Sequence, residues 1–237
     1  MKIALLGYGK MGKAIEKIAL ERGHEIVLKI GSKNINDLTK ENLIKADVAI
    51  DFSMPHTAFD FITAALKSNV PTISGTTAWL DKLPEVEILA HSNESGFIYA
   101  SNFSLGVNLF FEMNRKVAEI MNPQQNFDVS MKEIHHVHKV DAPSGTAISL
   151  AEGIFETGSS LNDWTLDNEN EKLQINVERT GEVPGTHIVE YRSEYDKISI
   201  EHEAINRNGF ALGAVVAAEW IIGKKGVFSM KDVLFSN

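Results

Sequence analysis

The spacing of hydrophobic residues divides the chain into two regions with different predicted architectures. In the first hundred residues, short continuous apolar runs alternate with segments of helical spacing. Continuous runs are typical of strands that are buried on both faces. They cover residues 3–6, 26–30 and 48–52, and residues 71–74 and 97–100 are two further short strand candidates. Strands that alternate with helices predict an α/β fold with a Rossmann-like, doubly wound parallel sheet.

The pattern changes near residue 102. Residues 105–121 have the spacing of one long helix, and residues 127–134 form a strand candidate. Three later runs alternate between apolar and polar positions, which predicts an antiparallel meander with one covered face. They lie at residues 173–177, 187–191 and 198–202. With the strand at 127–134 they predict a second, α+β domain with a mixed four-stranded sheet.

The remaining segments set the expected domain boundaries. Residues 156–171 are polar and are predicted to form a loop, whereas residues 209–222 form a final apolar helix. We expect that helix to return to the first domain. The predicted first domain therefore covers residues 1–104 and is completed by 207–237, and the second covers residues 105–206.

Composition narrows the possible partners. The 237 residues include 23 Lys and Arg against 32 Asp and Glu, a formal net charge of −9. An acidic chain without a basic block is a poor candidate for binding nucleic acid or a membrane surface, so neither partner is expected. The chain has no cysteine, which excludes disulfides and thiolate nucleophiles. The N-terminus lacks a signal-peptide pattern, and a cytoplasmic location is expected.

A glycine-rich turn follows the first predicted strand. Gly7, Gly9 and Gly12 form a GxGxxG pattern between a strand and a helix, the context in which this pattern binds dinucleotides. Glycines there permit a tight turn and a close approach of the backbone to a pyrophosphate. We therefore expect a nicotinamide dinucleotide on Gly7, Tyr8, Gly9, Lys10, Met11 and Gly12. The alternative is a glycine-rich turn that binds no ligand.

The end of the second strand bears on which nicotinamide cofactor is used. An Asp or Glu usually binds the adenosine ribose there, but Ser32 and Lys33 occupy this place and no acid is present. A serine and a lysine suit the 2′-phosphate of NADPH better than a free hydroxyl. NADPH is favoured, and NADH stays open because Lys33 is equally well explained as a solvated loop residue.

Polar turns follow three further strands. In a doubly wound sheet, ligands bind outside the carboxyl ends of the strands, so hydroxyls and glycine N–H groups there can face a cofactor. Ordinary turns or helix caps are the alternative interpretation. Beside Asp51–Ser53, the expected cofactor residues in these turns are Gly75, Thr76, Thr77, Ala100, Ser101, Asn102 and Phe103.

The densest group of chemically active residues directly follows the strand predicted at residues 127–134. His135, His136 and His138 precede Lys139 within five residues. Histidine exchanges protons near neutral pH and lysine is a cationic donor. Adjacent histidines on a strand point to opposite faces and no HExxH helix is present, so no metal is expected.

A predicted helix begins directly after this histidine–lysine group. Ser144 is a good N-cap, and the N–H groups of Gly145 and Thr146 would lack helical partners. A helix N-terminus beside basic side chains is suited to a carboxylate, which predicts a small acidic substrate bound by Ser144, Gly145 and Thr146. The alternative is a capped helix that follows a solvent-exposed basic loop.

These motifs together resemble the dihydrodipicolinate reductase (4-hydroxy-tetrahydrodipicolinate reductase) family. The most specific segment is EIHHVHKVDAPSGTA at residues 133–147. The other segments that carry the resemblance are GYGKMG at 7–12, IDFS at 50–53, GTT at 75–77, NFSLGVN at 102–108, Arg179-x-Gly181, Gly185-x-His187 and AINRNGFALGA at 204–214, which includes Arg207. The resemblance covers nearly the whole chain.

The resemblance implies an activity and roles for particular residues. The family uses NADPH or NADH to reduce a cyclic dicarboxylate to tetrahydrodipicolinate in diaminopimelate and lysine biosynthesis. Carried over, His135 is the general acid/base and Lys139 is the proton donor. His136, Lys139, Gly145 and Thr146 then bind substrate carboxylates. The family also implies a homotetramer built through the second domain, which would bind substrate and form the subunit interface.

Some features depart from the family pattern or leave alternatives open. Val137 stands where many members have arginine, and the segment 30–48 is short for the family. Whether the substrate is the hydroxylated ring or its dehydrated form stays open. Strict alternation would separate His136 from His135 and Lys139, so the strand must end near His135. The competing functions are another two-domain amino-acid dehydrogenase, such as a homoserine dehydrogenase, and a non-catalytic dinucleotide sensor.

Overall fold

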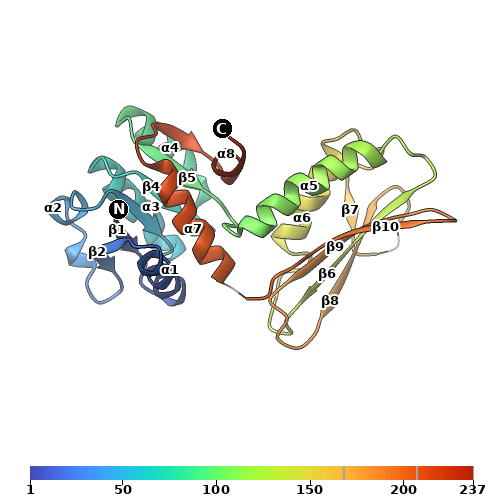
Figure 1. Cartoon of the computed structure of the whole chain (residues 1–237), viewed down its shortest axis with the longest axis horizontal. Helices are drawn as coiled ribbons and strands as arrows, with labels where there is room; N and C mark the ends of the chain where they lie inside the picture. The colour runs from blue at the N-terminus through green and yellow to red at the C-terminus, as the bar shows by residue number, and fades with distance from the viewer. Residues whose placement is uncertain (168, 207, 237) are drawn as a thin grey trace. The chain divides into compact units, whose positions relative to one another are not determined.

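The computed structural model describes residues 1–167, 169–206 and 208–236, and the chain divides into two compact units (Figure 1). One unit consists of Met1–Leu105 and Asn208–Asn237, and the other of Gly106–Arg207. Arg207, which belongs to the late family-like segment, lies outside the described residues.

The first unit contains a six-stranded parallel sheet with the order β11-β5-β4-β3-β1-β2. Its strands are β1 (Lys2–Leu6), β2 (Glu25–Ile30), β3 (Val48–Asp51), β4 (Thr72–Ser74), β5 (Gly96–Tyr99) and β11 (Gly226–Phe228). The prediction of a Rossmann-like parallel sheet is confirmed. The edge strand β11 was not predicted; a glycine occupies its first position, which weakens the strand pattern.

Helices on both faces explain why the strands read as continuous apolar runs. Ile3 and Leu5 of β1 belong to one core, whereas Ala4 and Leu6 of the same strand belong to another. The helices of this unit are α1 (Lys10–Glu21), α2 (Lys40–Leu43), α3 (Pro55–Lys67), α4 (Leu83–Ser92), α7 (Asn208–Ile221) and α8 (Met230–Phe235), with 3-10 turns at Ile35–Asp37 and Leu80–Lys82. The apolar helix α7 packs with α1 in the first of these cores.

The second unit contains a mixed five-stranded sheet with the order β10-β9-β6-β8-β7. Its strands are β6 (Asp128–His135), β7 (Trp164–Thr165), β8 (Leu173–Arg179), β9 (Thr186–Arg192) and β10 (Lys197–Glu203). Helices α5 (Leu105–Met121) and α6 (Gly145–Phe155) share a hydrophobic core with one face of this sheet. The mixed sheet is confirmed, and the two-residue strand β7 adds a fifth strand inside the segment that was predicted to be a loop.

The predicted meander is wrong in one respect. Strands β9 and β10 form the expected antiparallel pair, but β8 pairs in parallel with β6 rather than with β9. Strand β6 lies between β8 and β9, and the turn at residues 180–185 therefore crosses its carboxyl end. Backbone hydrogen bonds hold this crossing: Thr180 N–H donates to His135, and His136 N–H donates to Val183. Periodicity identifies a strand but not its partner.

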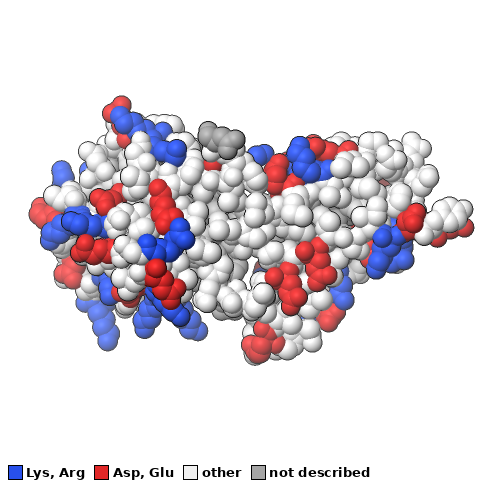
Figure 2. All heavy atoms as spheres, in the orientation of Figure 1, with Lys and Arg blue, Asp and Glu red and all other residues white. Residues whose placement is uncertain are grey.

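The surface carries charges of both signs. Basic and acidic side chains are interspersed over the face of the first unit that Figure 2 shows. Among the described residues, the structure contains no helix with the length and apolar character needed to cross a membrane.

A close approach within the first unit generates a stability prediction. An added Cβ on Gly213 of α7 would lie 1.7 Å from the carbonyl oxygen of Phe103. Alanine is favoured over glycine in a helix by about 1 kcal/mol, and overpacking costs about 1 to 3 kcal/mol; the clash should dominate because the atom in the way is a backbone oxygen, which cannot move aside easily. We expect Gly213→Ala to lower the free energy of unfolding, measured by urea denaturation. Gly209→Ala is the control, because its Cβ would meet Ser104 at an ordinary 3.6 Å. Equal stability of the two variants would show that position 213 does not require glycine.

Candidate active site

The glycine-rich turn has the geometry of an open anion site. Gly7 has a φ of +97°, and a Cβ on Gly12 would lie 2.3 Å from the Gly7 oxygen, so both positions require glycine. A Cβ on Gly9 would have no heavy atom of the described chain within 4 Å. Helix α1 begins at Lys10, and the residues that the structure describes in its first turn include no acidic side chain. Its free N–H groups therefore face space that an anion can enter.

A cavity of about 340 Å³ adjoins this turn. It is lined by Gly7, Tyr8, Gly9, Ile30, Gly31, Ser32, Ile35, Phe52, Ser53, Met54, His56, Thr57 and Phe61. A partly apolar cavity beside a helix N-terminus matches what an adenosine with an attached pyrophosphate needs. The residues present therefore fit a nicotinamide dinucleotide.

A second cavity, of about 500 Å³, lies at the end of β2 and is more basic. It is lined by Ser32 and Lys33, as the sequence led us to expect, and also by Lys13, Lys29 and Asn34. The Lys29 ammonium is already paired with Glu16 at 2.5 Å, and the Tyr8 hydroxyl also donates to Glu16. Lys33 is exposed. Lys13 and Lys29 were missed because helix α1 and the interior of β2 gave no reason to place them together.

The turn after β4 lines a third cavity, of about 210 Å³. Gly75, Thr76 and Thr77 lie there with Met11 and Ser53. The Thr76 hydroxyl accepts a hydrogen bond from Ser53 N–H at 2.9 Å, and Trp79 Nε1 donates to the Thr76 carbonyl at 2.6 Å.

The turn after β5 places its expected cofactor residues in different environments. Ser101 is exposed, and Ala100 and Asn102 are partly buried. Asn102 accepts a hydrogen bond from Ser104 N–H. The Phe103 side chain is 1% exposed and contacts Phe52 in the core, which leaves only its backbone for a cofactor.

Asp51, the last residue of β3, is fully buried. Ser74 Oγ donates to its Oδ2 at 2.7 Å and so joins the ends of β3 and β4. Burial raises the pKa of Asp51 from its ordinary value of 3.8 to about 6, and the hydrogen bond from Ser74 opposes that rise. The carboxyl group thus braces the edge of the sheet that carries the third cavity.

The second unit gathers titratable side chains where β6 ends. The β6 face that packs on α6 is apolar at Met131 but carries Glu133 and His135 further along. The register places His135 opposite Arg179 on one neighbouring strand and Glu133 opposite His187 on the other. Strand β6 ends at His135, as its predicted role with His136 and Lys139 requires.

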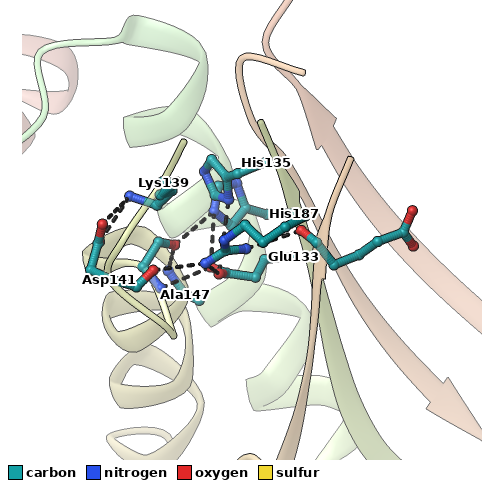
Figure 3. A network of polar contacts seen from close by, with 9 residues as sticks. Glu133, His135, Lys139, Asp141, Ala147 and His187 are labelled. Carbon is teal, nitrogen blue, oxygen red and sulfur yellow. Dashed lines mark hydrogen bonds and ion pairs between the residues drawn. The ribbon is translucent and has the colours of Figure 1, made fainter. Parts of the chain in front are cut away.

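Glu133 is the centre of this group (Figure 3). Its carboxylate has no exposed surface and accepts a hydrogen bond from Ser144 N–H at 2.9 Å and one from Arg179 Nη2 at 2.8 Å. The nearest nitrogens of His135 and His187 lie 3.9 and 4.0 Å from its oxygens. The two histidine rings meet edge to face, with centroids 5.1 Å apart.

Burial and charge set the protonation states of this group. Burial raises the pKa of Glu133, but hydrogen bonds from Ser144 and Arg179 outweigh it, and the net pKa is lowered. Burial lowers the pKa of His135, and Glu133 opposes that change. Burial, with the charge of His135, lowers the pKa of His187 to about 4. At neutral pH the carboxylate is therefore charged and both histidines are neutral.

The loop after β6 carries the predicted lysine. The Lys139 ammonium lies 2.8 Å from both oxygens of Asp141, and one-fifth of its side chain is exposed. His136 is partly buried, whereas His138 is exposed and lies 3.5 Å from Glu182. Lys139 therefore lies in the loop that joins the end of β6 to the start of α6, while the His138 side chain is exposed to solvent.

Helix α6 begins as predicted. Ser144 is its N-cap, with Oγ accepting from Ala147 N–H at 3.2 Å and lying 3.1 Å from His187 Nε2. The exposed Gly145 and the partly buried Thr146 form the first turn, whose N–H groups have no helical partner. This helix start can accept a carboxylate.

The same cluster also offers potential metal ligands. Glu133, His135 and His187 each provide one ligand atom, and these atoms lie within 4.8 Å of one another. Both Glu133 oxygens, however, already bind donors, and one donor is the cationic Arg179. A second cation there would be repelled, so the donor set suits proton binding better. The absence of a metal stays a prediction.

Sequence reasoning gave no role to Glu133, Arg179 or His187. All three stood in the family-like segments, but only as letters of a motif. A sequence signal for these residues existed: each is a polar or charged residue near the end of a predicted strand whose other inward-facing residues are apolar.

Comparison with known proteins decides the family. The family models "Dihydrodipicolinate reductase, N-terminus" and "Dihydrodipicolinate reductase, C-terminus" match residues 1–103 and 106–234. The chain belongs to the dihydrodipicolinate reductase family. The resemblance seen in the sequence is thereby confirmed.

Two curated relatives of the family and one solved structure show how far the likeness extends. The 4-hydroxy-tetrahydrodipicolinate reductase of Christiangramia forsetii is 51% identical over 99% of this chain and 98% of its own length. That of Methanopyrus kandleri is 37% identical over 80% of this chain and 72% of its own. The dipicolinate-bound dihydrodipicolinate reductase of Paenisporosarcina sp. TG-14 superposes with a TM-score of 0.80 at 26% identity, and 99% of each chain is covered.

The raised pKa of Asp51 generates a prediction about stability and pH. Because the pKa of Asp51 is higher in the folded than in the unfolded protein, the protonated form of Asp51 stabilises the folded state. This stabilisation is complete below pH 4, decreases between about pH 4 and 6, and is absent above pH 6. A difference of about two units corresponds to about 3 kcal/mol. As the pH rises from 4 to 6, the free energy of unfolding of Asp51→Asn should therefore increase relative to that of the parent, measured by urea denaturation at each pH. Asp60→Asn, on the exposed face of α3, should follow the parent. A pH-independent difference would refute the raised pKa.

Proposed function

We propose that this protein is a 4-hydroxy-tetrahydrodipicolinate reductase that transfers a hydride from a nicotinamide cofactor to give tetrahydrodipicolinate in diaminopimelate and lysine biosynthesis. The observation that carries the proposal is the arrangement where β6 ends: His135 contacts His187, which lies 3.1 Å from the α6 cap Ser144, and Lys139 lies in the loop that leads into this helix. Family membership and the 51% identical reductase support the same reaction. The ring is reduced in its hydroxylated or its dehydrated form.

Two features of the second unit suit a dicarboxylate. The N–H groups of Gly145 and Thr146 lie at the positive end of α6 and can bind one carboxylate, with Ser144 shaping the turn. Lys139 and His136, from the loop after β6, supply charge and hydrogen bonds for the other. The related structure from Paenisporosarcina sp. holds dipicolinate, which is itself a small dicarboxylate.

Lys139 and His135 divide the proton chemistry. Hydride addition leaves negative charge on the ring, which a nearby acid must neutralise. The lowered pKa of His135 makes it neutral at pH 7, so in this proposal Lys139 donates the proton. The negative charges of a bound dicarboxylate would raise the pKa of His135 and let it take part in the transfer.

The first unit is the proposed cofactor domain. The nicotinamide cofactor supplies the hydride when it is bound. Gly7–Gly12 would meet the pyrophosphate at the start of α1, and Gly75–Thr77 and Ala100–Phe103 would lie along the nicotinamide half. Lys33 and Ser32, beside Lys13, favour NADPH through its 2′-phosphate.

The second unit is the proposed substrate and assembly domain. Helices α5 and α6 cover one face of its sheet, and we infer that the other face joins copies of this chain in a homotetramer. The tetramer, a cytoplasmic location and the absence of nucleic-acid and membrane partners stay predictions.

A coupled assay tests the function directly. Pyruvate and aspartate semialdehyde are condensed enzymatically, and the absorbance of NADPH or NADH is followed after the protein is added. Oxidation that depends on the condensation product is expected. Cofactor binding without oxidation would favour the dinucleotide sensor, and oxidation of NADPH or NADH with aspartate semialdehyde alone, or with a 2-oxo acid and ammonium, would favour another dehydrogenase.

Lys139 provides the sharper catalytic test. Lys139→Ala removes the proposed proton donor and should lower kcat by about 100-fold or more, while the dissociation constant of the cofactor changes less than about twofold. Fluorescence titration with NADPH gives the second quantity. Lys132→Ala is the matched control and should keep normal turnover, because this lysine of β6 forms only a surface ion pair with Glu178 of the neighbouring strand β8. Normal turnover of Lys139→Ala would remove the residue from the mechanism.

Cofactor preference is tested at Lys33. Lys33→Ala should raise the KM for NADPH by about tenfold and leave the KM for NADH within about twofold, because only NADPH carries the 2′-phosphate. Lys40→Ala, an exposed lysine on α2, should leave both values unchanged. An equal effect of Lys33→Ala on the two cofactors would contradict the phosphate contact.

A further inference from the structure

Glu133 connects the elements that carry the proposed substrate-binding and proton-transfer residues. It lies near the end of β6, two residues before His135, and its carboxylate is fully buried. One oxygen accepts from Ser144 N–H, the residue that caps α6. The other accepts from Arg179 at the end of β8. A single side chain therefore joins β6, β8 and the start of α6 (Figure 3).

The Arg179 contact extends this connection to the lysine loop, which is the segment between β6 and α6 that carries Lys139. The same Nη2 atom that donates to Glu133 also donates to the Asp141 carbonyl at 2.7 Å. The Asp141 carboxylate in turn binds the Lys139 ammonium. The loop that carries Lys139 is thus anchored to Glu133 through one guanidinium.

Glu133 also acts on His135 through space. Its Oε1 lies 3.9 Å from His135 Nδ1, and its Oε2 lies 4.0 Å from His187 Nε2. The charged groups that influence His135 are Glu133, Lys139, Arg179 and Asp141. Among these, the carboxylates of Glu133 and Asp141 favour the protonated imidazole, and Glu133 has the larger effect.

We propose that Glu133 is a positioning residue, which fixes the start of α6 and the Lys139 loop relative to each other and keeps His135 able to accept a proton. The proposal rests on the function assigned above to His135, Lys139 and the first turn of α6. Only a carboxylate fits both donors, because a glutamine presents its N–H₂ group to one of them.

Glu133→Gln is the first test variant, since it conserves shape and removes the charge. Its matched control is Glu178→Gln on the adjacent strand β8, whose exposed carboxylate pairs with Lys132. Glu133→Asp keeps the charge on a shorter side chain and tests for partial rescue. Thermal unfolding and circular dichroism identify a variant that does not fold.

The first readout needs no substrate. The C2 proton of His135 is followed by NMR from pH 4 to 9 and assigned with His135→Asn. Removing Glu133 takes away the favourable charge, so the His135 titration in Glu133→Gln should move to lower pH. The titration should be unchanged in Glu178→Gln. An unmoved His135 titration in folded Glu133→Gln would overturn the electrostatic part of the proposal.

The second readout is steady-state kinetics over the same pH range. Glu133→Gln should lower kcat at least about tenfold and raise the KM for the substrate, with the KM for the cofactor unchanged. Glu133→Asp should recover part of kcat. Normal kcat and substrate KM in folded Glu133→Gln would overturn the proposal. A parent protein that turns over no condensation product would instead refute the proposed function, and the NMR result would still decide the effect on His135.

Discussion

The Glu133 carboxylate has no exposed surface, and a charge in that position is stable only when donors compensate the loss of water. Arg179 and the N–H of Ser144 supply that compensation. The carboxylate also fixes the positions of its donors, because each must stay within hydrogen-bonding distance of it. The order of the lysine loop and the beginning of α6 therefore follow from one buried charge, and a side chain that merely filled the same volume would specify neither.

Each of the two units is expected to bind an anion, although the net charge of the chain is −9 and repels anions. The two units overcome this repulsion in different ways. In the first unit, the start of α1 is left open by glycines and the basic side chains lie at its margin. In the second, the start of α6 is capped by Ser144 and the nearby cations are themselves paired with Glu133 and Asp141. Local backbone dipoles and placed cations can therefore outweigh the global charge, because they act at short range and away from bulk water.

Much of the fold could be predicted because its signals are local. The buried strands of the first sheet read as continuous apolar runs, since α-helices cover both faces. Helix α5 was predicted with its observed bounds, and the Ser144 cap was recognised from residue type. Strands β11 and β7 were not predicted; β11 is an edge strand that begins with a glycine, and β7 has only two residues. Helix α4 was also not predicted; its buried residues are Val86 and Ala90, a single pair that gives little periodicity.

The candidate site was predictable only as far as it is contiguous in sequence. His135, Lys139 and Ser144 lie within ten residues and carry a recognisable pattern, whereas Arg179 and His187 reach them only through strand pairing. Reading residues 173–202 as a simple meander placed β8 beside β9 and left no room for β6 between them. In the structure β6 occupies that place, and the turn at 180–185 must cross its end. This crossing brings Arg179 to one side of His135 and His187 to the other. The error in topology and the omission of Arg179 and His187 thus have one cause, because the period of a strand shows which residues share a face but not which strands are its neighbours.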